Sequence, residues 1–212
     1  MHSPLKRPCA VLALLLVLVP FSFSSAYDAR PRLIVIVVVD QLRGDLLDRF
    51  HDKFGPGGFR LLMDRGAYFA NCYYDYADTR TAPGHATLLT GAYADGHGIM
   101  GNRWWDPHLG KMVSPIQDAA TKVVGSQGSG VSPRILLAST LGDELKLATD
   151  GKARVFSISL KDYAAVLAGG RAADGVYWTV HADGAWVTSS YYRSELPKWV
   201  SDFNASGRTD RF

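Results

Sequence analysis

Cysteine is scarce in this chain of 212 residues, which contains only Cys9 and Cys72. Cys9 lies in an N-terminal segment that we expect to be removed, so Cys72 would be the one thiol of the mature chain. A single cysteine forms no intrachain disulfide, and it excludes a metal site built on several thiolates. Because Cys72 lies in the apolar stretch 67–74, we expect a buried and unreactive thiol.

The chain also lacks an apolar run long enough to span a bilayer, but its N-terminus has the pattern of an export signal. Two basic residues precede an apolar run over 9–19, and small residues follow it at 24–26. We therefore predict a signal peptide over 1–26 and a mature domain over 27–212. The mature protein would be exported to the periplasm or the extracellular space, without a transmembrane segment.

A strong charge of either sign is absent as well. The chain has 23 basic and 20 acidic residues, and removal of the predicted signal peptide leaves 21 basic and 20 acidic residues. So small a net charge gives no basic surface of the kind that binds nucleic acids, and we expect no nucleic-acid polymer as a partner. With 47% hydrophobic residues, the chain can form a buried core.

The order of the predicted elements favours an α/β domain with a parallel β-sheet flanked by helices. A continuous β-branched run over 33–39 predicts a strand that is buried on both faces. The stretch 93–114 follows neither a helical nor a strand period, which predicts a long loop. The other predicted strands are 67–74 and 155–159, and the other predicted helices are 59–65, 82–90, 132–150 and 196–203, with a short helix that ends at Gly169-Gly170. A hairpin of strands 177–180 and 186–189, joined across Asp183-Gly184, is predicted to decorate the domain.

The stretch 78–102, DTRTAPGHATLLTGAYADGHGIMGN, contains the main candidate for chemistry. Pro83 lies just inside a short apolar segment and Gly91 just past it, which predicts a helix with Thr81 at the capping position. A hydroxyl there would face unpaired backbone N–H groups and the positive end of the helix dipole, which stabilise an alkoxide and attract an anionic ester. From the residues alone, Thr81 is either an ordinary helix-start residue or a phosphoryl-transferring nucleophile.

Three other polar residues have two interpretations each. Asp40 ends the predicted strand 33–39, so it is either a solvated strand-end or capping residue, or a ligand at the sheet edge where parallel sheets bind ligands. Asn102 is either a turn residue or an amide donor to a phosphoryl oxygen. Lys161 directly follows the predicted strand 155–159, so it is either an exposed helix-start lysine or a second group at that edge.

The histidines give no sign of a metal site. None of the six forms a close pair with the helical or hairpin spacing that suits zinc. We therefore interpret His85 and His97, which lie within the stretch 78–102, as structural residues.

Four segments resemble the alkaline phosphatase superfamily in their order and spacing. They are VVVDQLRGD around Asp40, TRTAPGHATLLTG around Thr81, GHGIMGNRWW around Asn102 and SISLKD around Lys161. They are most similar to exported bacterial alkaline phosphatases with a threonine nucleophile, which in turn are similar to type I phosphodiesterases and nucleotide pyrophosphatases. The resemblance implies an alkaline-phosphatase-like fold whose C-terminal part is missing from this chain. It also implies metal-dependent hydrolysis of small phosphate monoesters through a phosphothreonine intermediate, with two zinc ions.

By this resemblance, Thr81 is the nucleophile and, with Asp40, a zinc ligand, whereas Asn102 and Lys161 donate to the phosphoryl oxygens. The family's other zinc ligands are Asp and His residues at downstream positions that this sequence does not contain. Tyr163 stands where monoesterases of this branch carry an arginine, and it either contacts the substrate or packs at a helix start. Phosphodiesterase or nucleotide pyrophosphatase activity is therefore the alternative. A truncated, catalytically inactive fragment is an alternative of another class.

Overall fold

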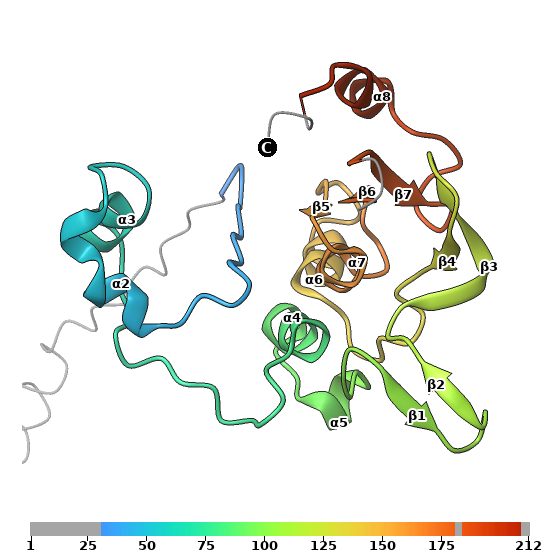
Figure 1. The fold of residues 1–212 in the computed structure, drawn as a ribbon, viewed down its shortest axis with the longest axis horizontal. Coiled ribbons are helices and arrows are strands. Elements are labelled where there is room, and N and C mark those ends of the chain that lie inside the picture. The colour runs from blue at the N-terminus through green and yellow to red at the C-terminus, as the bar shows by residue number, and fades with distance from the viewer. Residues whose placement is uncertain (1–30, 181–183, 209–212) are drawn as a thin grey trace, which may run out of the picture. The chain divides into compact units, whose positions relative to one another are not determined.

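The structure, a computed structural model, describes residues 31–180 and 184–208, which belong to two units, 1–43 and 44–212 (Figure 1). The predicted signal peptide and the predicted turn residue Asp183 lie outside the described residues. Within the described ranges, no helix is both long enough and apolar enough to cross a membrane.

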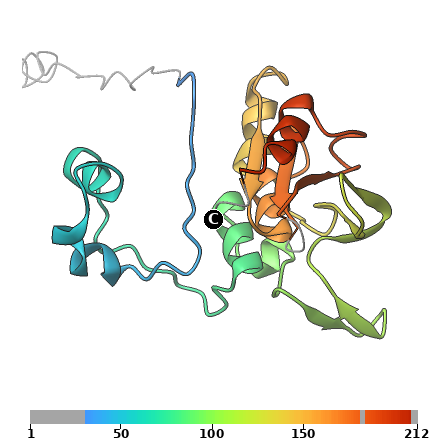
Figure 2. The same ribbon diagram turned by 45° about the horizontal axis from the view of Figure 1, so that its top comes forward.

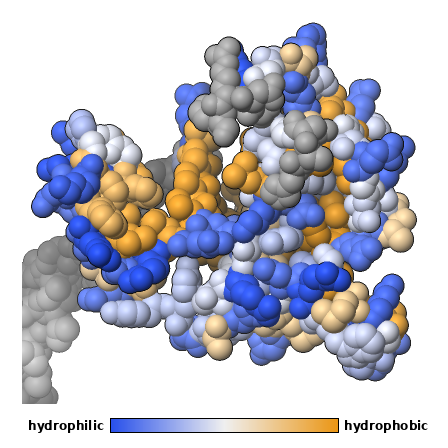
Figure 3. All heavy atoms as spheres, in the orientation of Figure 1, coloured by the Kyte–Doolittle hydropathy of each residue, from blue (hydrophilic) through white to orange (hydrophobic). Residues whose placement is uncertain are grey.

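The first unit contains the predicted strand over 33–39. This segment pairs with no strand among the described residues, and its apolar side chains are exposed, Leu33 by 79% and Val37 by 77%. Figure 3 shows it as a continuous run of hydrophobic residues. The prediction of a buried strand is therefore wrong for this structure. β-Branched residues favour an extended backbone, but only neighbouring strands can pair its N–H and C=O groups.

The second unit begins with short helices. They are α2 (Asp45–Arg49), the 3-10 helix η1 (His51–Lys53) and α3 (Phe59–Arg65). The prediction of α3, which ends at Gly66, is confirmed. The stretch 67–74 that follows is not a strand, and Cys72 within it is exposed, so both predictions for this stretch are wrong. As in the first unit, β propensity alone does not make a strand without a pairing partner.

A five-stranded sheet runs through the second unit in the order β4–β3–β7–β6–β5. Its strands are β3 (Gln117–Val124), β4 (Ser129–Val131), β5 (Phe156–Ser159), β6 (Gly175–Thr179) and β7 (Trp186–Ser189). β5 and β6 are parallel, whereas the other neighbours are antiparallel. The sheet is therefore mixed, and the prediction of a parallel sheet holds only for β5 and β6. The hairpin β6–β7, predicted as a decoration, belongs to this sheet.

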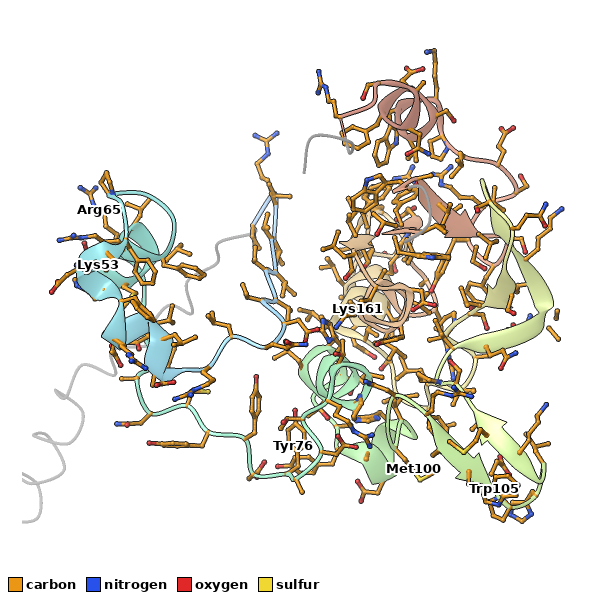
Figure 4. All side chains as sticks on the ribbon, viewed as in Figure 1. Lys53, Arg65, Tyr76, Met100, Trp105 and Lys161 are labelled. Carbon is orange, nitrogen blue, oxygen red and sulfur yellow. The ribbon has the colours of Figure 1, made fainter. Side chains whose placement is uncertain are left out.

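Two regions contain structure that the sequence pattern did not predict. The expected loop 93–114 holds the short helix α5 (Ala94–His97) and a hairpin of β1 (Trp104–Asp106) and β2 (Lys111–Val113), where Figure 4 shows Trp105. β3 has the sequence QDAATKVV, which lacks the apolar alternation of a strand. Its pairing with β4 also shifts register between Gln117 and Lys122, an irregularity that no local pattern predicts.

Two helices pack together on one face of the sheet. α4 (Thr81–Thr90) contacts α7 (Asp162–Gly169), and α7 also contacts β5 and β6 (Figures 1 and 2). The buried core there includes Val166 of α7 and Val176 and Trp178 of β6. This packing fixes the first turns of α4 and α7 relative to each other.

The other face of the sheet is covered by α8 (Lys198–Ala205), close to the predicted helix 196–203. Successive residues of a strand point to opposite faces, so Tyr177 points away from the face of Trp178. The ring of Trp199 in α8 lies edge-on to Tyr177, with 5.1 Å between the ring centroids. The sheet is therefore flanked by helices on both faces, as predicted.

Helix α6 (Leu141–Ala148) begins later than the predicted start at residue 132. Its true start is a capping box: the Asp143 N–H donates to the Thr140 hydroxyl at 3.2 Å, and the Thr140 N–H donates to the Asp143 carboxylate at 2.9 Å. Ser132, where the predicted helix began, lies outside α6, and its hydroxyl donates to Asp118 Oδ2 at 2.7 Å. A serine followed by proline was therefore a misleading signal.

Asp174, just before β6, links α6 to the start of β5. Its carboxylate pairs with Lys146 Nζ and Arg154 Nη1, each at 2.8 Å, and accepts the Val155 N–H at 2.8 Å. Burial raises the pKa of Asp174, but these three partners outweigh it and lower the pKa to about 2. The carboxylate thus helps to set the parallel pairing of β5 with β6.

Candidate active site

Thr81 is the first residue of α4, and Arg80 is the N-cap, so the predicted capping position was one residue too late. Gly91 ends the helix in the left-handed conformation, with φ of 67°, as predicted. Thr81 is buried, with 9% of its surface exposed. In such a position, water screens nearby charges less than it does at an open surface.

The backbone N–H groups of the first turn are less available than the sequence predicted. The Ala82 N–H donates to Oδ1 of Asn102 at 2.8 Å, and the Gly84 N–H donates to the Arg80 carbonyl at 2.8 Å. Pro83 has no N–H. The prediction of several unpaired N–H groups around Thr81 is therefore wrong. The backbone N–H groups of this turn are therefore not the main source of stabilisation for a charge on its oxygen.

Lys161 places a positive charge beside the Thr81 hydroxyl. It is the N-cap residue of α7 and follows β5 after one intervening residue, so it lies at the carboxyl end of the parallel pair, as predicted. Its Nζ donates to Oγ1 of Thr81 at 3.4 Å, although the two residues are 80 positions apart. Figure 4 shows Lys161 beside the start of α4. An ammonium group this close to a hydroxyl favours the deprotonated form of that hydroxyl.

Asn102 reaches the same helix start from the turn before β1. Because its Oδ1 accepts the Ala82 N–H, its NH₂ group is the end that can donate to a ligand. The structure therefore brings Thr81, Asn102 and Lys161 together. A hydroxyl, an amide donor and a cation at one point form a site that suits an anionic ester.

Two residues that the sequence analysis did not single out precede Thr81. Asp78 accepts hydrogen bonds from Arg80 through Nε at 2.9 Å, Nη2 at 2.6 Å and the backbone N–H at 3.1 Å. The side-chain hydrogen bonds from Arg80 lower the pKa of Asp78. The Asp-x-Arg spacing is the signal that could have identified this turn in the sequence.

His85 and His97 both serve the local structure. Nδ1 of His85 donates to the Thr81 carbonyl at 2.7 Å, since a carbonyl can only accept. In His97, Nδ1 accepts the Ile99 N–H at 3.0 Å, so Nε2 carries the proton and donates to the Thr87 hydroxyl at 3.0 Å. Burial lowers the pKa of His97, which keeps it neutral. The interpretation of both as structural residues is confirmed.

Tyr163 lies in the first turn of α7, two positions after Lys161. Its side chain packs against the hydrophobic core. It also lines, with Lys161 and Trp178, a cavity of about 500 Å³ between the start of α7 and strands β3, β4 and β6. The structure therefore gives Tyr163 a packing role and also places it beside a space that a substrate group could enter.

Asp40 belongs to the first unit, where it is exposed in a turn after the segment 33–39, whereas Thr81 belongs to the second unit. Among residues 31–180 and 184–208, no group of three His, Cys, Asp or Glu side chains could hold a metal ion. A catalytic zinc ion takes three protein ligands. The side chains in these ranges therefore do not fit a complete zinc site.

Comparisons with known proteins point to one family. The profile of the type I phosphodiesterase / nucleotide pyrophosphatase family matches residues 34–211. Alkaline phosphatase PhoV of Synechococcus elongatus is 41% identical over 186 residues, which are 87% of this chain and 34% of that protein. Alkaline phosphatase PafA of Elizabethkingia meningoseptica is 43% identical over 178 residues, which are 82% of this chain and 33% of that protein. The chain thus spans about a third of the length of these relatives.

Solved structures agree with these matches. A crystal structure of wild-type alkaline phosphatase PafA has a TM-score of 0.82 at 42% identity, over 84% of this chain and 35% of that chain. A PafA variant has a TM-score of 0.79 at 40% identity, over 81% of this chain and 34% of that chain. In that variant, serine replaces a threonine, and alanine replaces an asparagine, a lysine and an arginine.

Proposed function

We propose that this chain carries the nucleophile of a phosphate-ester hydrolase, because it belongs to the type I phosphodiesterase / nucleotide pyrophosphatase family. That family is a hydrolase family of the alkaline phosphatase superfamily. The nucleophile in this proposal is Thr81. The observation that carries it is the convergence of Lys161 and Asn102 on the start of α4. Lys161 Nζ lies 3.4 Å from Thr81 Oγ1, and Asn102 Oδ1 lies 2.8 Å from the next backbone nitrogen.

In the proposed reaction, Oγ1 of Thr81 attacks the phosphorus atom of a small phosphate ester, and its hydroxyl proton goes to solvent. A bond forms between Oγ1 and phosphorus while the bond from phosphorus to the substituent oxygen breaks. The substituent leaves as an alkoxide, which takes a proton from water and becomes an alcohol. Water then attacks the phosphothreonine, releases phosphate and restores the threonine hydroxyl. The sum is the consumption of one water molecule for each ester.

Lys161 and Asn102 have separate roles in this reaction. The Lys161 ammonium group stabilises negative charge on Oγ1 and on the phosphoryl group, and the Asn102 NH₂ group donates to a phosphoryl oxygen. The replaced residue types of the solved PafA variant, in their order along the chain, support this assignment. This chain has Thr81, Asn102 and Lys161 in the same order, and Tyr163 in place of the arginine.

The resemblance also implies two zinc ions with Asp40 and Thr81 among their ligands. The described side chains do not supply three ligands together, so no step of the proposed reaction is assigned to a metal. Zinc binding remains a prediction for this protein. Asp40 is its first candidate ligand, since a carboxylate is a common ligand of this ion.

Hydrolysis of phosphodiesters or nucleotide pyrophosphates is a second candidate function, favoured by the environment of Tyr163. A monoester dianion carries charge that an arginine fork can hold, whereas tyrosine offers one neutral donor and a ring face. The cavity of about 500 Å³ beside Lys161 and Tyr163 is of a size that accommodates a small ligand. A second substituent on phosphorus would have room there.

Export to the periplasm or the extracellular space is part of this proposal. It is supported by the pattern of basic, apolar and small residues over 1–26. An exported hydrolase of this kind would act on small phosphate esters outside the cytoplasm.

Replacement of Thr81 tests the proposal in the full product of the gene that encodes this chain. We expect Thr81→Ala to abolish nearly all turnover and Thr81→Ser to keep part of it, because serine lacks only the methyl group. The measurement is steady-state hydrolysis of an aryl phosphate. If Thr81→Ala retained turnover within about tenfold of the parent, a barrier change of about 1.4 kcal/mol, Thr81 would be only a helix-start residue.

A further inference from the structure

We propose that Arg80 is a positioning residue that holds the Asn102 amide on the start of α4. Asp78 holds Arg80 through hydrogen bonds, and the Arg80 guanidinium lies against Gly101. The Gly101 backbone in turn positions Asn102, whose Oδ1 accepts the Ala82 N–H. This chain of contacts is a property of the fold. Its consequence for catalysis, which is the orientation of the Asn102 NH₂ group toward a phosphoryl oxygen, rests on the proposed function.

The first contact, between Asp78 and Arg80, holds both the backbone and the side chain of Arg80. The Asp78 carboxylate accepts the Arg80 backbone N–H at 3.1 Å and is bridged by the guanidinium at 2.9 and 2.6 Å. The Arg80 carbonyl accepts the Gly84 N–H, which is the first backbone hydrogen bond of α4. Asp78 therefore constrains the residue whose conformation determines where α4 begins, directly before Thr81.

The second link depends on the missing side chain of Gly101. This glycine is buried, and a Cβ atom on it would lie 2.9 Å from Nη2 of Arg80 and 3.5 Å from Cζ. The guanidinium therefore packs directly on the Gly101 backbone. The next residue is Asn102, whose Oδ1 accepts the Ala82 N–H at 2.8 Å. A shift of Gly101 would move this amide away from the helix.

Geometry, rather than charge alone, is the basis of this role. The side chains of Arg80 and Asp78 are 59% and 33% exposed, and ion pairs exposed to solvent contribute little net stability. A planar guanidinium can bridge two carboxylate oxygens and still lie flat on a backbone. A lysine keeps the charge but provides neither the fork nor the flat face.

Amide hydrogen exchange in the 212-residue chain, measured residue by residue by NMR, tests the proposal. We expect Arg80→Ala to increase the exchange rate of the Ala82 amide at least about tenfold, because that amide loses its acceptor. Gly101→Ala should have the same effect with Arg80 and Asp78 intact, because its Cβ would displace the guanidinium. Arg80→Lys should not restore protection. The Gly91 amide, which donates to Thr87 at the other end of α4, should stay unchanged in every variant.

Arg134→Ala is the matched control, since Arg134 is 63% exposed and paired with Asp118 at 2.7 Å, elsewhere in the chain. Unchanged Ala82 exchange in Arg80→Ala, or full protection in Arg80→Lys, would overturn the proposal. If Arg80→Ala accelerated the exchange of every amide through loss of folding, the Ala82 exchange rate in Gly101→Ala would decide the question. Unchanged Ala82 exchange in that variant would overturn the proposal. Addition of inorganic phosphate to the full product of the gene separates the two claims. An Asn102 NH₂ resonance that does not respond to phosphate in the parent counts against the proposed function and leaves the positioning role standing.

Discussion

Replacement of Lys161 by methionine probes the electrostatic part of the site, because methionine removes the charge and keeps a side chain of similar length. The Lys161 Nζ atom lies 3.4 Å from Oγ1 of Thr81. Two unit charges at that distance attract by about 5 kcal/mol at an effective dielectric constant of about 20, and by about 1 kcal/mol at the value of water. Because Thr81 is buried and Lys161 is half-buried, we expect a loss nearer the upper value.

In rate terms, each 1.4 kcal/mol is about tenfold, so Lys161→Met should reduce kcat/KM at least about a hundredfold. Lys161→Arg, which keeps the charge, should retain more activity. Lys198→Met is the control, since that lysine is 87% exposed and paired with Asp202. The assay is aryl phosphate hydrolysis by the full product of the gene. A loss of less than about tenfold in Lys161→Met would refute the assignment of Lys161 to charge stabilisation.

Three further predictions concern the ester, the metal and the fold. Tyr163→Arg should raise the preference for an aryl phosphate over its methyl diester, measured as the ratio of kcat/KM values, and no rise would refute a substrate role for Tyr163. The 212-residue chain alone should bind zinc weakly in calorimetry and show little turnover with added zinc, and turnover at typical enzyme rates of about 1–1000 per second would contradict this. Asp174, whose pKa falls from 3.8 to about 2 on folding, stabilises the fold above pH 3.8, and this stabilisation is lost as the pH falls from 3.8 toward 2. Asp174→Asn should remove that part of the pH dependence in urea unfolding, on the order of 2 kcal/mol, and an unchanged pH profile would contradict the ion-pair assignment.

Local signals in the sequence predicted those elements whose ends depend on one or two residues. Pro83 lies in the first turn of α4 and Gly91 follows its last residue, while Gly170 follows α7 with φ of 70°. A helix start accepts proline, and a positive φ favours glycine. The start of α6 was misplaced because the prediction began the helix at Ser132 and Pro133, while the true capping box at Thr140 lies further along the chain.

Strand pairing could not be predicted in the same way. β3 lies between β4 and β7, and its contact with β7 joins residues more than sixty positions apart, which no local period encodes. The β-branched segment 33–39 shows the converse. Its composition predicts a buried strand, but it is exposed and pairs with no strand among the described residues.

The sequence predicted three residues that the structure brings together at the start of α4, but not their contacts. Thr81, Asn102 and Lys161 were identified from the helix start, the turn, the strand end and the family resemblance. That Asn102 accepts the Ala82 N–H, and that Arg80 packs on Gly101, depends on the tertiary packing of the turn against α4. Asp40 stays a predicted zinc ligand.

Identification of the covalent intermediate shows whether Thr81 is the nucleophile. The full product of the gene is mixed with an aryl phosphate, quenched in acid within the first turnover, digested and sequenced by mass spectrometry. We expect a phosphoryl group on Thr81, its shift to the serine in Thr81→Ser, and its absence in Thr81→Ala. Steady hydrolysis with no phosphorylated Thr81 peptide, or with the phosphoryl group on another residue, would show that Thr81 is not the nucleophile.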